Sequence, residues 1–464
     1  MHTALPLEKF LEWESRFPNR IFLRQPLNGQ WLTWTWSSAG NEIRRVARGL
    51  REQGLKPGDH VALLSKNCAH WIMADLAIMM AGCCSIPLYP TLTSATIRTI
   101  LNHSDAKAII IGKLDDYAEQ QQGIPDQLLR MSFDTYGIRE SHCWNDWVRN
   151  YAPIEKPFQW DPEAILTIVY TSGTTGNAKG VMHRAKTFGI VMDEVSRVME
   201  IPFQPNMFSF LPLSHVAERL AVEMNIIFNC GMASFAESLD SFAENLASVQ
   251  PDAFFAVPRI WAKFREGITK KIPEKKLARL LRIPVLNTLI RKSIRKKLGL
   301  SKARIILSAA APISLEMLQW YQRLGITIFQ VYGMSEDSVY AHFNKIGANR
   351  FGSVGRPLPG LQVKFSDEGE ILVKSPGNFV GYYKEPELTA EVFDEEQYLK
   401  TGDKGEYDKD GYLFITGRIK DQFKTDKGKY ISPAPTELML LANPFIEQCC
   451  VVGMGIPQPI ALIV

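Results

Sequence analysis

The stretch Tyr170–His183 reads YTSGTTGNAKGVMH, and the rest of the chain is organised around it. It follows an apolar run, Ile165–Tyr170, that is typical of a buried strand. Eight of its fourteen residues are Gly, Ser, Thr or Lys, so it offers backbone N–H groups, hydroxyls and one ammonium to a polyanion. The Walker A pattern cannot be laid on it. We predict a phosphate-binding glycine loop of another kind; a flexible surface loop is the alternative.

Small residues and one lysine give this glycine loop its chemistry. Gly173, Gly176 and Gly180 allow positive φ, so the backbone can approach phosphates closely. Lys179 supplies a positive charge next to them. The pattern therefore favours a ligand that carries several negative charges.

Length and composition limit the class of protein. At 464 residues the chain is too long for one small core, so we expect two or more domains. Its apolar content of 46% and charged content of 22% are those of an ordinary soluble globular protein. Charged residues interrupt the N-terminus, so no signal peptide is expected. The cysteines form no CxxC pair and no metal-ligand spacing, which predicts a reducing, cytoplasmic location without disulfides or zinc. They are Cys68, Cys83, Cys84, Cys143, Cys230, Cys449 and Cys450.

Apolar strands alternate with helical patterns through most of the chain. This rhythm predicts an α/β fold with helix-covered, mostly parallel sheets. Strands are expected at 61–64, 85–88, 108–111, 165–170, 207–211, 253–257, 305–307 and 326–331. Helices are expected at 7–16, after an N-cap at Ser37 or Ser38, at 69–82 and 186–199, and after an N-cap at Ser314. From Phe351 onward, short strands and turns predict a small β subdomain over 351–417.

The longest apolar stretch, Trp71–Tyr89, has two readings. Its length approaches that of a membrane span, but it contains Asp75, and Pro87 and Pro90 lie near its end. We favour a helix followed by a strand, both buried in a sheet.

Three polar loops leave the carboxyl ends of apolar strands. They are the glycine loop, Ser308–Pro312 (SAAAP) and Tyr332–Glu336 (YGMSE). In open α/β sheets this edge is where ligands bind. We therefore expect the three loops to converge on one cleft.

These motifs resemble those of the adenylate-forming (AMP-binding) superfamily of acyl-CoA synthetases, luciferases and peptide-synthetase adenylation domains. The resemblance covers almost the whole chain, and the glycine loop matches the family's long, specific phosphate-binding pattern. It implies a large N-terminal domain followed by a small α+β C-terminal domain. It assigns the phosphates of ATP to Thr171, Ser172, Gly173, Thr174, Thr175, Gly176 and Lys179, with Lys179 among the catalytic residues.

The resemblance extends to the nucleotide site. Ser308–Pro312 matches the segment that lines the adenine pocket, which assigns Ala309, Ala310 and Ala311 to that pocket. In the Tyr332–Glu336 motif, the ring of Tyr332 offers a flat face to adenine and Ser335 offers a hydroxyl to the α-phosphate, with Gly333 and Met334 between them.

The same motif supplies the expected metal ligand. Glu336, also counted as catalytic, is a hard oxygen ligand suited to Mg²⁺, which would join the phosphates, and Thr171 is the second candidate near the metal.

Thr401–Asp403 matches the ribose-binding motif, in which the Asp403 carboxylate accepts from two hydroxyls. Arg418 would add a second ribose contact.

Two further segments resemble long-chain acyl-CoA synthetases. His215 lies in LPLSHVAER, on the acyl-chain side of those enzymes, and is assigned to the acyl pocket and to catalysis. Trp261, in VPRIW, would line or gate an apolar channel. For both residues the alternative is structural: a satisfied histidine after a strand, and a tryptophan packed in the core.

The reaction implied by the resemblance has two steps. A fatty acid carboxylate attacks the α-phosphate of ATP to give an acyl-adenylate and pyrophosphate, and the thiolate of coenzyme A then displaces AMP. The protein positions the reactants and neutralises phosphate charge. In the family the C-terminal domain swings between the steps about a hinge that maps to Lys420.

This hinge divides the expected domains, residues 1–419 and 420–464. The family carries a further catalytic lysine near the end of its C-terminal domain. The chain ends at Val464 within an apolar run, so we expect only the beginning of that domain and a slow adenylation step if nothing follows it.

Charge is unevenly distributed. The net charge is +4, yet residues 263–304 hold 15 Lys and Arg against Glu266 and Glu274, an excess of 13 that leaves −9 for the rest. Apolar residues recur there at helical spacing between the cations: Val285, Leu286, Leu289, Ile290, Ile294 and Leu298. This basic amphipathic helix could lie on an anionic membrane surface, attract coenzyme A phosphates, or be a solvated face over a core stripe. Nucleic-acid binding is disfavoured because no aromatic stacking platform accompanies the charge.

Three functions remain open at the level of sequence. The first is ligation of a long-chain fatty acid to coenzyme A, with ATP, Mg²⁺ and small-molecule substrates. The second is an acyl-adenylate ligase that loads a carrier protein. The third is a non-catalytic binder of ATP or acyl chains. The sequence does not define acyl chain length or oligomeric state.

Overall fold

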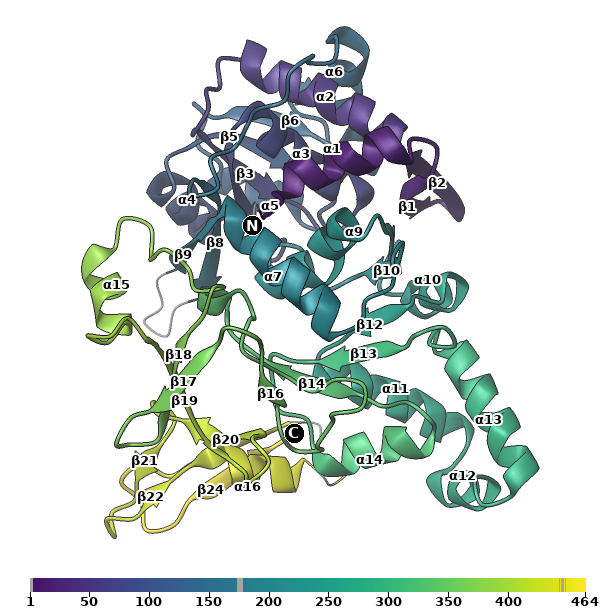
Figure 1. Cartoon of the computed structure of the whole chain (residues 1–464), viewed down its shortest axis with the longest axis vertical. Coiled ribbons are helices and arrows are strands. Elements are labelled where there is room, and N and C mark those ends of the chain that lie inside the picture. The colour runs from purple at the N-terminus through teal and green to yellow at the C-terminus, as the bar shows by residue number, and fades with distance from the viewer. Residues whose placement is uncertain (1–2, 173–177, 442, 444–445, 447) are drawn as a thin grey trace. The chain divides into compact units, whose positions relative to one another are not determined.

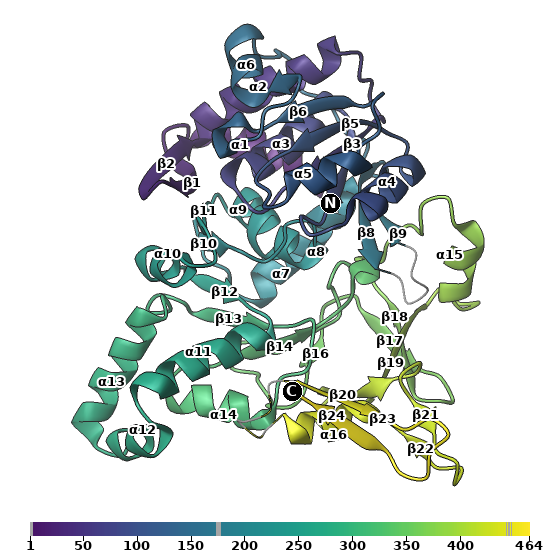
Figure 2. The same cartoon turned by 180° about the vertical axis from the view of Figure 1, so that it is seen from behind.

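A computed structural model describes residues 3–172, 178–441, 443, 446 and 448–464 (Figures 1 and 2). The chain forms two compact units, each made of segments that are not continuous in sequence. Unit 1 comprises Met1–Pro251 and Gly377–Thr389, and unit 2 comprises Asp252–Pro376 and Ala390–Val464. The expected domains, residues 1–419 and 420–464, stay a prediction.

Unit 1 is built on a seven-stranded sheet with the strand order β7-β6-β5-β3-β4-β8-β9. Its neighbours pair in parallel except β8 and β9, which form an antiparallel hairpin. The strands are β3 (His60–Leu64), β4 (Cys84–Leu88), β5 (Ala106–Ile111), β6 (Leu129–Ser132), β7 (His142–Cys143), β8 (Ile165–Ser172) and β9 (Ala178–Arg184). The predicted helix-covered, mostly parallel sheet is confirmed, and its central strands β3 and β4 are buried along nearly their whole length because both faces are covered.

Helices cover this sheet on both faces. From α4 (Ser94–His103), Ile97, Ile100 and Leu101 pack onto one face. α3 (Ala69–Ala81) is buried along its whole length and packs against α2 (Trp36–Glu52). The stretch Trp71–Tyr89 is therefore a buried helix followed by a strand, as predicted. No helix within the described part of the chain is both long and apolar enough to cross a membrane.

A second, four-stranded sheet of unit 1 has the order β10-β11-β1-β2. Its strands are β1 (Ile21–Leu27), β2 (Gln30–Thr35), β10 (Asn206–Ser209) and β11 (Met232–Phe235). The remaining helices of this unit include α1 (Pro6–Arg16), α5 (Tyr117–Gln120), α6 (Trp144–Asn150), α7 (Ala185–Val198), α8 (Val216–Glu218), a π-helical turn at Arg219–Met224, α9 (Asn225–Phe228) and α10 (Phe242–Val249).

The N-cap of α2 differs from the prediction. Ser37 or Ser38 was expected, but Thr35 caps the helix: its Oγ1 accepts from the N–H of Ser38 at 3.1 Å, and the Ser38 hydroxyl accepts from the N–H of Thr35 at 2.8 Å. This reciprocal pair satisfies two backbone donors, which a cap at Ser37 or Ser38 would not do.

Unit 2 contains a five-stranded sheet with the order β12-β13-β14-β15-β16. Its strands are β12 (Ala253–Phe255), β13 (Ile305–Ser308), β14 (Phe329–Tyr332), β15 (His342–Phe343) and β16 (Arg356–Pro357). Its helices are α11 (Pro258–Lys271), α12 (Glu274–Leu280), α13 (Pro284–Lys297) and α14 (Leu315–Arg323). β14 begins three residues later than predicted, because the N–H of Ile326 bonds to the carbonyl of Tyr321 and closes the end of α14 around Gly325.

The rest of unit 2 is rich in short strands. An antiparallel sheet contains β17 (Gln362–Phe365), β18 (Glu370–Lys374), β19 (Leu399–Tyr407) and β20 (Leu413–Arg418). The last elements are β21 (Phe423–Lys424), β22 (Tyr430–Ile431), α16 (Pro433–Leu440), β23 (Cys449–Val452) and β24 (Ile460–Ile463), and α15 (Pro386–Val392) spans the boundary between the units.

Candidate active site

In unit 1 the glycine loop joins the β8–β9 hairpin. Thr171 lies directly opposite Lys179, and Ser172 lies opposite Ala178. The candidate residues Gly173, Thr174, Thr175 and Gly176 lie outside the described residues. The hairpin therefore fixes Thr171 and Lys179 side by side at the base of the loop.

A distant segment supports the base of the loop. The N–H of Tyr383 donates to the carbonyl of Gly180 at 2.8 Å, and the N–H of Met182 donates to the carbonyl of Gly381 at 3.1 Å. The ammonium of Lys179 lies 5.3 Å from the centre of the Tyr382 ring. Sequence reasoning did not identify this support, because the segment lies some two hundred residues along the chain and carries no motif of its own.

His215 follows β10 in unit 1 and caps the short helix α8. Its Nδ1 accepts from the N–H of Ala217 at 3.1 Å, so a neutral ring carries its proton on Nε2. Burial lowers the pKa of His215 below its ordinary value. The residue therefore acts as a helix cap and presents Nε2–H as a donor, and its assignment to the acyl pocket and to catalysis stays a prediction.

A buried charge cluster follows His215, and sequence reasoning missed it. The guanidinium of Arg219 donates to Asp75 at 2.5 Å, to Glu223 at 3.1 Å and to the hydroxyl of Thr167 at 2.8 Å, and the charged side chains are fully buried. Burial, with the charge of Asp75, raises the pKa of Glu223 well above its ordinary value. The cluster ties α3, β8 and the π-helical turn together. Asp75 inside an apolar helix was the available signal.

In unit 2 two of the predicted loops meet at one sheet edge. β13 and β14 are parallel neighbours, with Leu307 opposite Phe329 and Ser308 opposite Gln330. Ser308–Pro312 and Tyr332–Glu336 follow the carboxyl ends of these two strands. The expected meeting of these two loops is thus found within the unit, and their convergence with the glycine loop stays a prediction.

The alanine segment has an unusual backbone. Ala310 has a φ of +69°, which L-residues other than Gly, Asn and Asp seldom adopt. Ala309 is buried, whereas Ala310 and Ala311 are exposed. The buried hydroxyl oxygen of Ser308, at the start of the segment, has no hydrogen-bond partner among the described residues. Strain together with an unsatisfied polar atom is typical of a ligand-binding edge.

Tyr332, Asp403 and Arg418 form a connected group. The hydroxyl of Tyr332 donates to Oδ2 of Asp403 at 2.8 Å, and Nε of Arg418 donates to Oδ1 at 3.1 Å. Burial raises the pKa of Asp403, although both donors favour its charged form. Each carboxylate oxygen keeps a second lone pair, so Asp403 can still accept from hydroxyl groups of a ligand. Three residues that the sequence assigned to adenine and ribose thus lie together.

The turn after Tyr332 is tightly built. A Cβ at Gly333 would lie 2.5 Å from the backbone of Val339, so only glycine fits there. The N–H of Met334 donates to Asp337 at 2.8 Å, and burial raises the pKa of Asp337 to about 7. Ser335 is nearly buried, and Glu336 is half-buried.

No group of three potential metal ligands occurs among the residues that the structure describes. The candidate ligands Glu336 and Thr171 offer hard oxygens, the kind that Mg²⁺ prefers. Thr171 belongs to unit 1 and Glu336 to unit 2, and their joint role as Mg²⁺ ligands stays a prediction.

Trp261 and Lys420 have contrasting surroundings. Trp261 is fully buried in unit 2, its indole N–H donates to the carbonyl of Ala256 at 3.1 Å, and its ring packs on Phe254 and Tyr321. This is the packing of a core residue, and a role in an acyl channel stays a prediction. Lys420 is exposed just after β20, and its role as the hinge is likewise a prediction.

Comparison with known proteins adds to this geometry. The protein called long-chain-fatty-acid–CoA ligase FadD15 from Mycobacterium bovis is 28% identical over 97% of this chain and 80% of that relative. The solved structure of the anthranilate CoA ligase AuaEII in complex with anthranoyl-AMP has a TM-score of 0.82 at 21% identity, over 99% of this chain and 86% of that one. The solved structure of the adenylation domain of a carboxylate reductase from Mycobacterium chelonae has a TM-score of 0.83 at 21% identity, over 100% of this chain and 79% of that one.

These structural likenesses confirm the adenylate-forming fold. The model of the family described as AMP-binding enzyme matches residues 10–383, well over half of the sequence. This chain therefore belongs to the AMP-binding enzyme family.

Proposed function

We propose that the protein joins a long-chain fatty acid to coenzyme A at the expense of ATP. The observation that carries the proposal is Asp403, held between Tyr332 and Arg418 where a ribose would be bound. Membership of the AMP-binding enzyme family supports ATP as the nucleotide substrate. Likeness to a long-chain-fatty-acid–CoA ligase along nearly the whole chain supports a long-chain fatty acid as the acid substrate.

The chemistry starts from a carboxylate, which is a poor electrophile because its oxygen leaves badly. One carboxylate oxygen attacks the α-phosphorus of ATP, the bond to the bridging oxygen breaks, and pyrophosphate leaves. The sulfur of coenzyme A then attacks the acyl carbon, AMP leaves with the carboxylate oxygen, and the thiol proton goes to solvent. Because both steps move charge among phosphates, the protein acts mainly by positioning and by charge neutralisation.

The chain's own residues have distinct parts in this proposal. Asp403 and Arg418 bind the ribose, and Tyr332 stacks on adenine beside Ala309–Ala311. Lys179, Ser335 and the glycine loop hold the phosphates. His215 and Trp261 are assigned to the acyl pocket, and Lys420 to the hinge between the two steps.

Mg²⁺ is part of the proposal as an ion held by Glu336 and Thr171 together with the phosphates. When bound, it neutralises charge on the phosphate oxygens.

The experiment is release of AMP and pyrophosphate from ATP by the purified protein, across fatty acids of rising length, with and without coenzyme A. We expect AMP release that requires both a long acid and coenzyme A. Adenylate formation that does not depend on coenzyme A would favour loading of a carrier protein instead. ATP binding without turnover of any acid would rule out both and leave a binder.

A further inference from the structure

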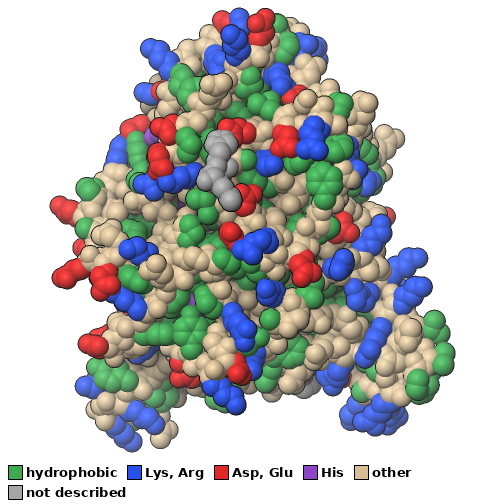
Figure 3. Space-filling model, viewed as in Figure 1, with side chains coloured by type: hydrophobic (Ala, Val, Ile, Leu, Met, Phe, Trp, Pro, Cys, Tyr) green, Lys and Arg blue, Asp and Glu red, His purple; other side chains and the backbone are tan. Residues whose placement is uncertain are grey.

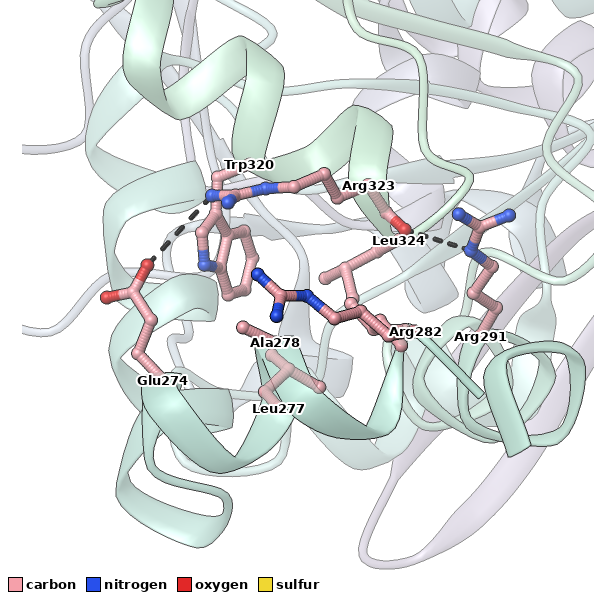
Figure 4. A pocket seen from close by; sticks show the side chains of 9 residues that line it. Glu274, Leu277, Ala278, Arg282, Arg291, Trp320, Arg323 and Leu324 are labelled. Atoms are coloured by element: carbon pink, nitrogen blue, oxygen red, sulfur yellow. Dashed lines mark hydrogen bonds and ion pairs between the residues drawn. The ribbon is translucent and has the colours of Figure 1, made fainter. Parts of the chain in front are cut away.

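The helices α12 and α13 of unit 2 enclose a cavity against α14 that the proposed reaction does not use. Its volume is about 280 Å³, and Figure 4 shows it from close by. Its floor is apolar and almost fully buried: Leu277, Trp320 and Leu324. Its walls carry three arginines: Arg282, Arg291 and Arg323.

The positive charge on these walls is poorly compensated. Among the described residues that line the cavity, Glu274 is the one carboxylate, and it lies 4.0 Å from Arg323. The same carboxylate is 3.4 Å from Arg265, which also pairs with Glu316 at 2.7 Å. The cavity therefore has a net positive charge and attracts an anion.

Two of the wall arginines have donors to spare. Nε of Arg291 donates to the carbonyl of Arg323 at 2.9 Å, which fixes the side chain and leaves its terminal nitrogens for another partner. Arg282 reaches toward the indole of Trp320 in Figure 4 and makes no ion pair with any residue that the structure describes. A planar guanidinium binds phosphate oxygens in a bidentate manner, so phosphate is the anion that this arrangement favours.

Outside the lining of the cavity, the first turns of α13 expose large apolar side chains. Val285 is 72% exposed and Leu289 is 59% exposed, with Ile283 and Leu286 beside them. Figure 3 shows hydrophobic and basic side chains together in the part of unit 2 that Figure 1 labels α12 and α13. The sequence predicted a basic amphipathic helix here. The structure shows that only the C-terminal part of its apolar stripe is buried, at Ile294.

We propose that the α12–α13 hairpin docks on an anionic phospholipid membrane. The phosphate of one headgroup occupies the arginine-lined cavity, and Val285, Leu286 and Leu289 enter the boundary between headgroups and acyl chains. Apolar insertion beside a cationic site is the combination that holds interfacial helices. The inference concerns the surface of unit 2 and does not depend on the proposed reaction.

The test is sedimentation of the whole protein with lipid vesicles, either of neutral phosphatidylcholine or with about a third of phosphatidylglycerol. We expect strong binding to the anionic vesicles only. Arg282→Gln should weaken it about fivefold, since one cation near the surface has that effect, and Arg282→Lys should restore part of it. Val285→Ser with Leu289→Ser should weaken it more than tenfold.

Matched controls lie outside the hairpin. Lys409→Gln removes an exposed cation from a turn of unit 2, and Leu239→Ser removes an apolar side chain that is 91% exposed in unit 1. Both should bind vesicles like the unaltered protein. Binding of ATP in the absence of vesicles, and the circular dichroism spectrum, should be the same for all variants.

Three results would overturn the proposal. One is equal binding to neutral vesicles. Another has two parts: inorganic phosphate at low millimolar concentration binds through Arg282 and competes with vesicles, and the variant with Val285→Ser and Leu289→Ser binds vesicles normally. That result would make the cavity a site for a free anion. The third is a dimer in solution that the serine variant dissociates, which would make this face a contact between two copies.

Discussion

At the scale of single residues, the candidate nucleotide site is organised by Asp403. Its two oxygens take one donor each from Tyr332 and Arg418, which hold the carboxylate in a fixed orientation within unit 2. A carboxylate held in this way is preorganised, because no further side-chain ordering is needed when a ligand hydroxyl arrives.

The first prediction concerns this carboxylate. Asp403→Asn keeps the shape but removes the charge, and it places an amide N–H₂ against Arg418 or the ligand. We expect KM for ATP to rise about 10- to 100-fold, since hydrogen bonds to charged groups contribute about 1.5–3 kcal/mol. Asp367→Asn, an exposed residue of the same unit, is the control. If KM for ATP is unchanged in the Asp403→Asn variant, the assignment of Asp403 to ribose binding is wrong.

The second prediction concerns the strained alanine. Ala310→Gly should leave stability unchanged or raise it by up to about 1 kcal/mol, because relief of the left-handed conformation exceeds the extra chain entropy of glycine. Ala310→Val should lower it by about 1–3 kcal/mol, because a β-branched side chain fits this φ poorly. Urea unfolding measures both. Equal stability of the two variants would show that the strain is absent in solution.

At the scale of elements, the β8–β9 hairpin decides how the glycine loop is held. Gly180 lies in β9, where a Cβ would be 2.8 Å from Cγ2 of Ile168 and 3.2 Å from the ring of Tyr170. Cβ of Tyr383 would lie 3.3 Å from the same Cβ, and the neighbouring Tyr382 ring lies 5.3 Å from the ammonium of Lys179.

Gly180→Ala should therefore destabilise the protein by about 1–3 kcal/mol through overpacking, and it should raise KM for ATP by displacing Lys179. Gly267→Ala is the matched control, because nothing lies within 4 Å of a Cβ at that position in α11. There alanine should stabilise the helix by up to about 1 kcal/mol. The free energy of unfolding in urea and KM for ATP are measured for both variants. Equal values for the two variants would contradict the account.

A pH dependence follows from Glu218, the last residue of α8. Glu218 is buried and accepts from the hydroxyl of Ser209 at 2.9 Å and the N–H of Phe210 at 3.1 Å, and burial raises its pKa from 4.5 to about 8. The folded chain therefore keeps a proton that the unfolded chain loses. The stability that this group contributes is full below pH 4.5 and is lost as the pH rises toward 8, with a slope of up to about 1.4 kcal/mol per unit.

Glu218→Gln should remove this dependence, because the amide is neutral at every pH. The difference in free energy of unfolding between the two proteins, measured by urea at pH 5, 6.5 and 8, should shift in favour of the variant as the pH rises. A constant difference across that range would mean that Glu218 titrates normally.

Local patterns predicted most of these elements, and contacts distant in sequence account for what they missed. Continuous apolar runs such as Ile165–Tyr170 predict buried strands because both faces of the sheet are covered. The cap of α2 was misassigned because Thr35 and Ser38 satisfy each other, which a one-residue rule overlooks. The pairing of Arg219 with Asp75 and the support of β9 by Tyr382 were missed because these partners lie more than a hundred residues apart in sequence, where periodicity carries no information.

At the scale of the whole molecule, the chain joins two units whose sequences interleave. The candidate phosphate-binding loop belongs to unit 1, whereas the candidate adenine and ribose residues belong to unit 2. The family pattern links these motifs at the level of sequence, since each is a short segment with its own chemistry. The acyl side was harder to predict, because His215 caps α8 through Nδ1 and Trp261 packs in the core with its indole N–H bonded to a carbonyl.

The central claim is that the protein makes a long-chain acyl-adenylate and passes its acyl group to coenzyme A. The most direct measurement is a single turnover with ATP labelled at the α-phosphate and a long-chain fatty acid, analysed by mass spectrometry before and after coenzyme A is added. We predict a labelled acyl-adenylate that disappears as labelled AMP and the acyl-coenzyme A appear. Labelled ADP in place of the adenylate, or an adenylate that coenzyme A does not consume, would contradict the account.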